Sequence, residues 1–123
     1  TATEQMLPGM PACVEAAMLA KMSDRGQIAG CVVDGPLALD VALCKEAAEI
    51  KKLKSEVAGD ADCCVFPSIE AANVFYKFAG HFCPGVKLAA MVPGAKAPCV
   101  LSSRADSTET KLNSIALAAL TAK

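Results

Sequence analysis

The segment LSSRADSTETK, at residues 101–111, combines the residue types that bind anions. Arg104 supplies a fixed positive charge beside the hydroxyls of Ser102 and Ser103, and a helix is expected to begin shortly after them. The first N–H groups of a helix lack intrahelical acceptors, so they offer an anion further donors. One guanidinium group can bind two phosphate oxygens at once through two parallel N–H donors. The segment therefore predicts a site for phosphate or for a phosphate group of coenzyme A.

A second group of polar residues follows the apolar stretch at residues 62–66. Glu70, Asn73 and Lys77 are spaced at i, i+3 and i+7, so they share one face of the predicted helix. The apolar stretch has no alternation, which is typical of a strand that is covered on both faces. Ligands of open α/β sheets bind at the carboxyl ends of such strands. This face is therefore a candidate ligand surface.

Asp34 holds a similar position after the strand predicted at residues 28–33. It could cap the following helix or contact a ligand, and both interpretations stay open. Pro36 suits the first position of that helix.

Other polar residues have ordinary structural explanations. Asp106 and Glu109 are three residues apart at a helix start, which is typical of a capping box. His81 is interpreted as an incidental surface or packing residue, since no Ser/His/Asp set can be assembled around it. The sequence contains neither a G-x-G-x-x-G nor a P-loop lysine motif.

The elements that would position these residues alternate between helix and strand. Val14, Met18 and Met22 recur at four-residue steps, and this stripe is expected to face the core. Helices are expected at residues 13–25, 37–51, 69–79 and 107–121, with Gly26 and Gly80 as stops, and strands at 28–33, 62–66, 86–92 and 99–101. This order predicts an α/β fold, a three-layer sandwich with a mostly parallel sheet of about four strands.

Composition excludes several classes of protein. The chain has 123 residues, a net charge of −1 and no long apolar run, which argues against nucleic-acid or membrane binding. Its seven cysteines are an odd number without a C-x-x-C pair, and it has one histidine, so no metal site is expected. These features predict a reduced, cytoplasmic protein of one compact domain.

Four segments together resemble the phosphate acyltransferases, the family of phosphate acetyltransferase and phosphate butyryltransferase. They are VDGPLALD at residues 33–40, the stretch at residues 57–77 that includes AGDAD and P-x-I-E-A-x-N-x-x-Y-K, PGAKAPCVLSSRADS at 93–107 and ETKLNSIALAAL at 109–120. The similarity runs from about residue 11 to the end of the sequence. The wording S-R-A-D-S-x-E-T-K is more similar to the butyryltransferase branch.

The resemblance implies a reversible reaction in which acyl-CoA and phosphate give acyl phosphate and coenzyme A. Coenzyme A would be a substrate, no cofactor would be bound permanently, and the acyl group would be short and butyryl-like. Family members are similar in fold to isocitrate and isopropylmalate dehydrogenases, have two α/β domains and pair as homodimers. Residues 1–98 would then be the second domain, and residues 99–123 a strand and helix that return to the first. The chain is expected to be a fragment with little activity of its own.

The resemblance also implies roles for individual residues. Arg104 and Ser103 would line the cleft and contact the phosphate and the acyl carbonyl. The acetyltransferase branch has an aspartate base six residues after that arginine, but Thr110 stands there in this sequence, so Glu109 is the neighbouring candidate. The candidates for substrate or coenzyme A binding are Asp34, Glu70, Asn73, Lys77, Gly94 and Lys96.

Two alternatives belong to other classes. A non-catalytic α/β dimerisation or interaction module would be indifferent to the loss of Arg104. A relative of the metal-dependent dehydrogenases would bind nicotinamide and a divalent metal, but no cluster of aspartates on one helix supports that alternative.

Overall fold

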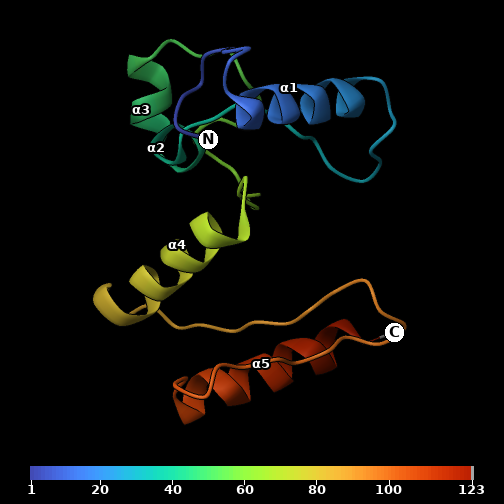
Figure 1. Cartoon of the computed structure of the whole chain (residues 1–123), viewed down its shortest axis with the longest axis vertical. Coiled ribbons are helices and arrows are strands. Elements are labelled where there is room, and N and C mark those ends of the chain that lie inside the picture. Colours follow the sequence, from blue (N-terminus) through green and yellow to red (C-terminus); the bar gives the residue numbers. More distant parts are fainter. Residues whose placement is uncertain (123) are drawn as a thin grey trace. The chain divides into compact units, whose positions relative to one another are not determined.

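The computed structural model describes residues 1–122 and contains five helices (Figure 1). They are α1 Pro11–Asp24, α2 Leu39–Leu43, α3 Lys45–Ile50, α4 Ile69–Phe82 and α5 Thr108–Thr121. The chain divides into two compact units, Thr1–Ala72 and Asn73–Lys123, and the division falls within α4. In the part of the chain that the structure describes, no helix has the length and apolar character needed to cross a membrane.

Small side chains form the core of the first unit. Cys13 of α1, Val41 and Ala42 of α2, and Ala48 of α3 are buried. The predicted core stripe of α1 is therefore wrong in its orientation, because Val14 and Met18 are about half exposed. Small residues on the inner face let neighbouring backbone lie close to the helix, which the apolar periodicity alone does not reveal.

The helix predicted at residues 37–51 is divided into α2 and α3 at Cys44, which has an extended backbone. The carbonyl of Val41 accepts the N–H of Gly59 at 2.8 Å, and the carbonyl of Ala42 accepts that of Ala61 at 3.2 Å. In a continuous helix these carbonyls would accept from residues 45 and 46. Hydrogen bonds from a distant loop therefore replace the intrahelical ones and interrupt the helix.

The termini of the longer helices largely follow their sequence signals. The side chain of Ser68 accepts the N–H of Ala71 at 3.2 Å, which confirms it as a cap for α4. Gly26, with φ +71°, confirms the predicted stop after α1. Gly80 is not a stop: it lies inside α4, where a side chain would collide with Leu88. The absence of a Cβ there serves packing rather than helix termination.

The described residues do not form the predicted parallel sheet. Their one recorded β-bridge is antiparallel and joins Val92 to Cys99. Val32 and Val65, in two of the predicted strands, are 63% and 83% exposed. A β-favouring stretch becomes a strand only when another strand pairs with its backbone, and that partner is not encoded in the stretch itself.

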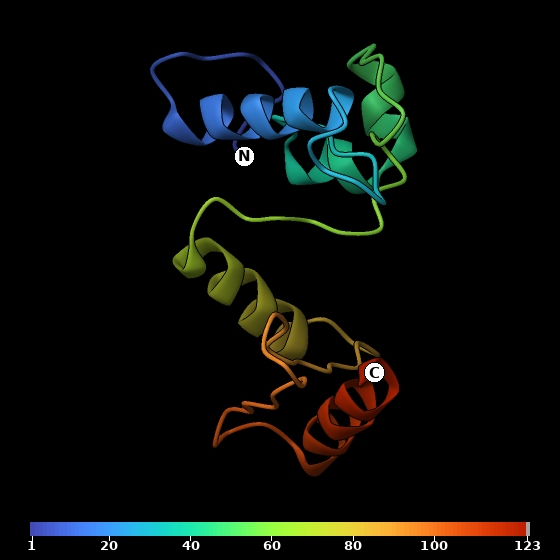
Figure 2. The ribbon, with the colours of Figure 1, turned by 90° about the vertical axis from the view of Figure 1, so that its right-hand side faces the viewer.

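In the second unit, an extended segment joins α4 to the loop before α5 (Figure 2). Ser114 of α5 is 1% exposed, and its hydroxyl accepts the N–H of Ala90 at 3.0 Å while it donates to the carbonyl of Thr110 at 2.7 Å. Asn113 donates to the carbonyl of Leu88 at 3.5 Å. These contacts hold residues 88–90 of the extended segment along α5.

We predict that Gly59→Ala destabilises the first unit more than Gly26→Ala does. Both glycines have positive φ, but a Cβ at Gly59 would lie 2.6 Å from the Cα of Lys45, whereas the space around Gly26 is open. Gly26→Ala should cost about 1 kcal/mol in free energy of unfolding, and Gly59→Ala about 1–3 kcal/mol more. Urea unfolding measures both changes, and equal losses would contradict the close packing of residues 57–61 on α2 and α3.

Candidate functional site

The start of α5 is fixed by Ser107. Its hydroxyl accepts the N–H of Thr110 at 3.1 Å and lies 3.0 Å from the Thr110 hydroxyl. The capping-box interpretation of Asp106 and Glu109 is therefore wrong. Serine and aspartate are comparable helix caps, so local sequence does not decide between adjacent candidates. Because Ser107 takes the capping position, the carboxylate of Asp106 is available for other contacts.

Asp106 closes a turn around Arg104. Its carboxylate accepts the N–H of Ser103 at 2.8 Å, and its own N–H donates to the carbonyl of Ser103 at 3.1 Å. The hydroxyl oxygen of Ser103 accepts the N–H of Ala105 at 3.4 Å, which leaves the hydroxyl proton for a ligand. Arg104 lies on the exposed side of this turn. The turn thus presents a hydroxyl donor and a guanidinium group together.

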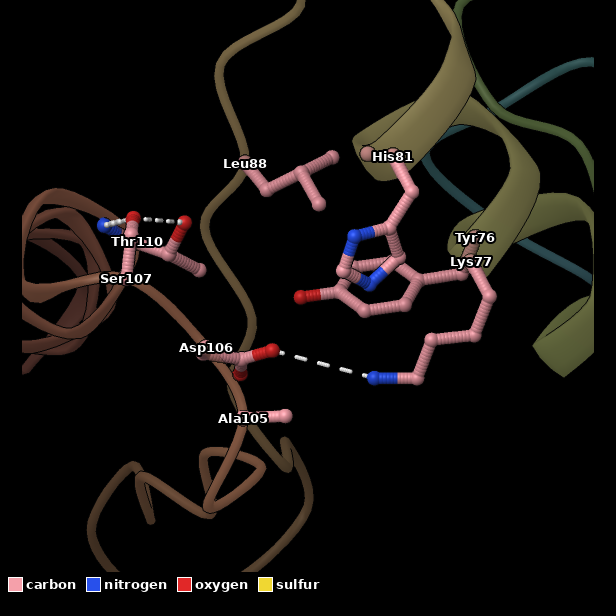
Figure 3. Close-up of a pocket in the computed structure, with 9 residues that line it drawn as sticks. Tyr76, Lys77, His81, Leu88, Ala105, Asp106, Ser107 and Thr110 are labelled. Atoms are coloured by element: carbon pink, nitrogen blue, oxygen red, sulfur yellow. Dashed lines mark hydrogen bonds and ion pairs between the residues drawn. The ribbon is translucent and has the colours of Figure 1, made fainter.

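Lys77 connects α4 to this turn. Its ammonium lies 3.7 Å from Oδ1 of Asp106, a carboxylate only 8% exposed, as the dashed line in Figure 3 marks. The same ammonium lies 5.2 Å from the centre of the Tyr76 ring. The predicted residues Lys77, Ser103 and Arg104 are therefore brought into one region by Asp106, whose importance the sequence analysis missed.

A pocket of about 310 Å³ lies beside this ion pair. Tyr76, Lys77 and His81 extend from α4 toward Asp106, Ser107 and Thr110 on its other side (Figure 3). The lining residues are Tyr76, Lys77, Gly80, His81, Leu88, Ala105, Asp106, Ser107 and Thr110. His81, interpreted from sequence as incidental, thus lines a pocket in the second unit. Tyr76 was not predicted, although its place next to Lys77 on the same helix offered a signal.

Burial raises the pKa of Tyr76 above its ordinary value of 10.0, and the negative charge of Asp106 raises the pKa further. A phenolate would lose hydration and be repelled by the neighbouring carboxylate. The phenol is therefore the favoured form of Tyr76 in this pocket.

Glu109 points to a different contact. Its carboxylate lies 2.8 Å from the ammonium of Lys87, and both side chains are exposed. Thr110, rather than Glu109, lines the pocket.

The remaining predicted residues lie elsewhere in the two units. In the first unit, Asp34 accepts the N–H of Gly35 at 2.7 Å at the edge of a pocket of about 520 Å³. Backbone hydrogen bonding and the Ser68 hydroxyl lower the pKa of Glu70 in the first turn of α4. In the second unit, Asn73 is exposed on α4, and Gly94 and Lys96 line a pocket of about 220 Å³.

Among residues 1–122, no group of three or more His, Cys, Asp or Glu side chains is placed to hold a metal ion.

Comparisons with known proteins point in one direction. Residues 4–119 match the family model described as phosphate acetyl/butaryl transferase. The chain is 58% identical over 121 residues to a phosphate butyryltransferase of Clostridium acetobutylicum, covering 98% of this chain and 40% of that protein. It is 54% identical to a phosphate acetyltransferase of Thermotoga maritima, covering 97% of this chain and 40% of that protein.

A solved structure is similar as well. It is a branched-chain phosphotransacylase from Enterococcus faecalis V583, with a TM-score of 0.85 and 36% sequence identity. The match covers 97% of this chain and 42% of that one. The chain thus spans about 40% of the length of these relatives.

We predict that Asp106→Asn lowers the pKa of Tyr76 relative to the unchanged chain but leaves it above 10.0, because burial persists when the carboxylate charge is removed. Tyr76 is the only tyrosine and the chain has no tryptophan, so phenolate absorbance during a pH titration reports this residue alone.

Glu109→Gln is the matched control, since that exposed carboxylate pairs with Lys87 and should leave the Tyr76 titration unchanged. Far-UV circular dichroism at each pH confirms that the helices persist. An identical Tyr76 pKa in the unchanged chain and in folded Asp106→Asn would contradict the placement of Asp106 beside Tyr76.

Proposed function

Because this chain belongs to the phosphate acetyl/butaryl transferase family, we propose that it carries part of the active site of a phosphate acyltransferase. Acyl-CoA and inorganic phosphate would be converted reversibly to acyl phosphate and coenzyme A. Coenzyme A is a substrate in this proposal, not a resident cofactor. We expect little turnover from these residues alone, since they span about 40% of the matched relatives.

The observation that carries the proposal is the turn that holds Ser103 and Arg104 just before α5. Asp106 fixes both the N–H and the carbonyl of Ser103, and Arg104 lies exposed between these anchors. A guanidinium group beside a hydroxyl donor suits an oxyanion with two or more oxygens. Phosphate and the developing carbonyl oxyanion of acyl transfer are both such groups.

The proposed chemistry is direct displacement at the thioester carbonyl. A phosphate oxygen attacks the carbonyl carbon, a C–O bond forms, the C–S bond breaks, and the coenzyme A sulfur leaves with the electron pair and becomes a thiol by protonation. Arg104 would hold phosphate and offset charge on the carbonyl oxygen, while Ser103 donates a hydrogen bond. In the reverse direction a base must remove the thiol proton.

Glu109 is the proposed base for that proton. Thr110 is unsuited to the role at neutral pH, and its hydroxyl is engaged with Ser107. The carboxylate of Glu109 would have to leave its exposed ion pair with Lys87 to reach a thiol. An exposed ion pair of this kind contributes little free energy, so separating Glu109 from Lys87 would cost little.

We also propose which acyl group is transferred and which residues contact the acyl-CoA. The 58% identity to a phosphate butyryltransferase supports a short, butyryl-like acyl group. Further candidate contacts for the acyl-CoA are Asp34, Glu70, Asn73, Lys77, Gly94 and Lys96. Among them, Lys77 has the strongest support because it lines the pocket next to the Ser-Arg turn.

The finer architecture also belongs to the proposal. Residues 1–98 would form the second α/β domain of a three-layer fold similar to isocitrate and isopropylmalate dehydrogenases, and residues 99–123 would return to the first domain. The TM-score of 0.85 to a phosphotransacylase supports this arrangement. So does the exposure of β-favouring residues such as Val32 and Val65, which a completed sheet would cover.

A cytoplasmic homodimer completes the proposal. All seven cysteines are free thiols, which suits a reducing compartment. An exposed apolar stripe on α4 suits an interface, and its members at four-residue steps are Val74, Phe78 and Phe82.

We predict that Phe78→Asp lowers the molecular mass measured by sedimentation. Leu112→Asp on α5 is the comparison, because Leu112 is similarly exposed, and it should leave the mass unchanged. An unchanged mass with Phe78→Asp would remove this helix face from the interface.

We predict that Arg104→Ala lowers kcat/KM for butyryl-CoA and phosphate by about 100- to 1,000-fold, because one charge-stabilising donor is lost. The assay uses the natural polypeptide that contains this sequence. It follows loss of thioester absorbance, since a thiol reagent would also react with the cysteines of the protein.

Arg25→Ala is the matched control, because Arg25 is the other arginine of the chain and only ends α1. Its activity should stay within about threefold of the unchanged protein. Full activity in Arg104→Ala would contradict the site, and absence of turnover and of coenzyme A binding in the unchanged polypeptide would favour the interaction-module alternative.

A further inference from the structure

The carboxylate of Asp106 has two separate partners, one for each oxygen. Oδ2 accepts the N–H of Ser103 at 2.8 Å, and Oδ1 lies 3.7 Å from the ammonium of Lys77. With 8% of its side chain exposed, this carboxylate has little hydration to stabilise its charge. A nearly buried carboxylate is stabilised by such hydrogen-bonded and charged partners.

The two partners come from distant parts of the sequence of the second unit. Ser103 belongs to the turn that presents Arg104, and Lys77 projects from α4. The contact of Lys77 with Oδ1 restrains the carboxylate, and the contact of Oδ2 with Ser103 restrains the turn. Orientation of the turn is therefore coupled to α4 through one side chain.

The guanidinium of Arg104, by contrast, has no ion-pair partner recorded among residues 1–122. A long exposed side chain has many rotamers, and ordering it on a ligand costs entropy. Fixing the backbone on both sides of Arg104 removes a second cost, that of ordering the backbone, before the ligand binds. The anchors of Ser103 and Asp106 lie on either side of Arg104 in the sequence.

We propose that Asp106, held by Lys77, is the positioning residue that sets the Ser103–Arg104 turn for catalysis of acyl transfer. This inference rests on the proposed acyltransferase function and adds two residues that would act through the turn rather than on the reacting atoms. Lys77 accordingly has a positioning role in addition to lining the pocket. A purely structural turn would instead depend on the hydrogen bond to Ser103 and be indifferent to the charge of Lys77.

Three substitutions separate the hydrogen bond from the charge. Asp106→Asn keeps an oxygen acceptor for the N–H of Ser103 but loses the attraction to Lys77, whereas Asp106→Ala loses both. Lys77→Met removes the charge from the exposed end of the pair and leaves the turn residues unchanged. Lys77→Arg is the conservative variant that should restore function.

We expect kcat to fall about 10-fold in Asp106→Asn and Lys77→Met and about 100-fold in Asp106→Ala, as for a displaced catalytic group. KM for acyl-CoA should stay within about threefold in the Asp106 variants, because Asp106 is not among the proposed acyl-CoA contacts. Lys77→Met should also raise this KM, since Lys77 is one of those candidate contacts. Lys77→Arg should recover most of kcat. The double variant Asp106→Asn/Lys77→Met should be no worse than the more impaired single variant, since both substitutions break one interaction.

Lys21→Met/Asp24→Asn is the matched control, an exposed ion pair on α1 at 3.0 Å that should leave kcat unchanged. Far-UV circular dichroism checks folding of each variant, and Lys77→Met provides the test if Asp106→Ala fails to fold. Unchanged kcat in Lys77→Met, or additive losses in the double variant, would overturn the inference.

A second measurement distinguishes failure of the inference from failure of the proposed function. Binding of inorganic phosphate is followed by the NMR signal of the Arg104 side-chain Nε–H. If the unchanged protein has no turnover but phosphate shifts this signal, and Asp106→Asn weakens that binding, the function fails while the positioning of Arg104 by Asp106 stands. Loss of a negative charge alone would strengthen phosphate binding, so weaker binding reports the turn. If turnover is present and both kcat and phosphate binding are unchanged in Asp106→Asn, the positioning role fails and the function stands.

Discussion

The nearly buried carboxylate of Asp106 makes the contacts on which the geometry of the second unit's candidate site depends. It joins the N–H of Ser103 to the ammonium of Lys77, and so connects a turn before α5 to the middle of α4. Loss of either partner would leave one oxygen of this nearly buried side chain without its contact. Within that unit, the orientation of the Ser-Arg pair is therefore a property of tertiary packing as well as of local sequence.

Small residues make the other close contacts of the fold possible. Ser114 and Ala118 are the buried residues of α5, and Cys13 is that of α1, while larger apolar side chains such as Leu120 are exposed. The hydroxyl of Ser114 reaches the backbone of Ala90 directly, which a larger side chain would prevent. The exposed apolar side chains remain available for contacts with other surfaces, as the proposed homodimer and completed sheet require.

The features that could be predicted from the sequence are those determined by neighbouring residues. The caps at Ser68 and Gly26 and the position of Ser103 and Arg104 before α5 follow from short-range chemistry. The break between α2 and α3 could not be predicted, because hydrogen bonds from Gly59 and Ala61 cause it.

The role of Asp106 was obscured for a related reason. Asp106 and Ser107 are both good helix caps, and the contacts of Asp106 with Ser103 and with the distant Lys77 distinguish their roles. Pairing of the β-favouring segments depends in the same way on partners far along the chain. The combined motifs were enough to identify a resemblance to the phosphate acyltransferases from the sequence. Residues 4–119 match the model of that family.

Amide hydrogen exchange at Ser103, measured by NMR on the unliganded chain, tests the central contact most directly. If Asp106 accepts this N–H in a stable turn, exchange should be slowed by at least about 100-fold relative to an unstructured peptide. It should also be slower than exchange at Arg104, whose N–H has no recorded acceptor among residues 1–122. Exchange at Ser103 as fast as at Arg104 would show that the turn is not held before a ligand binds, and would contradict the account.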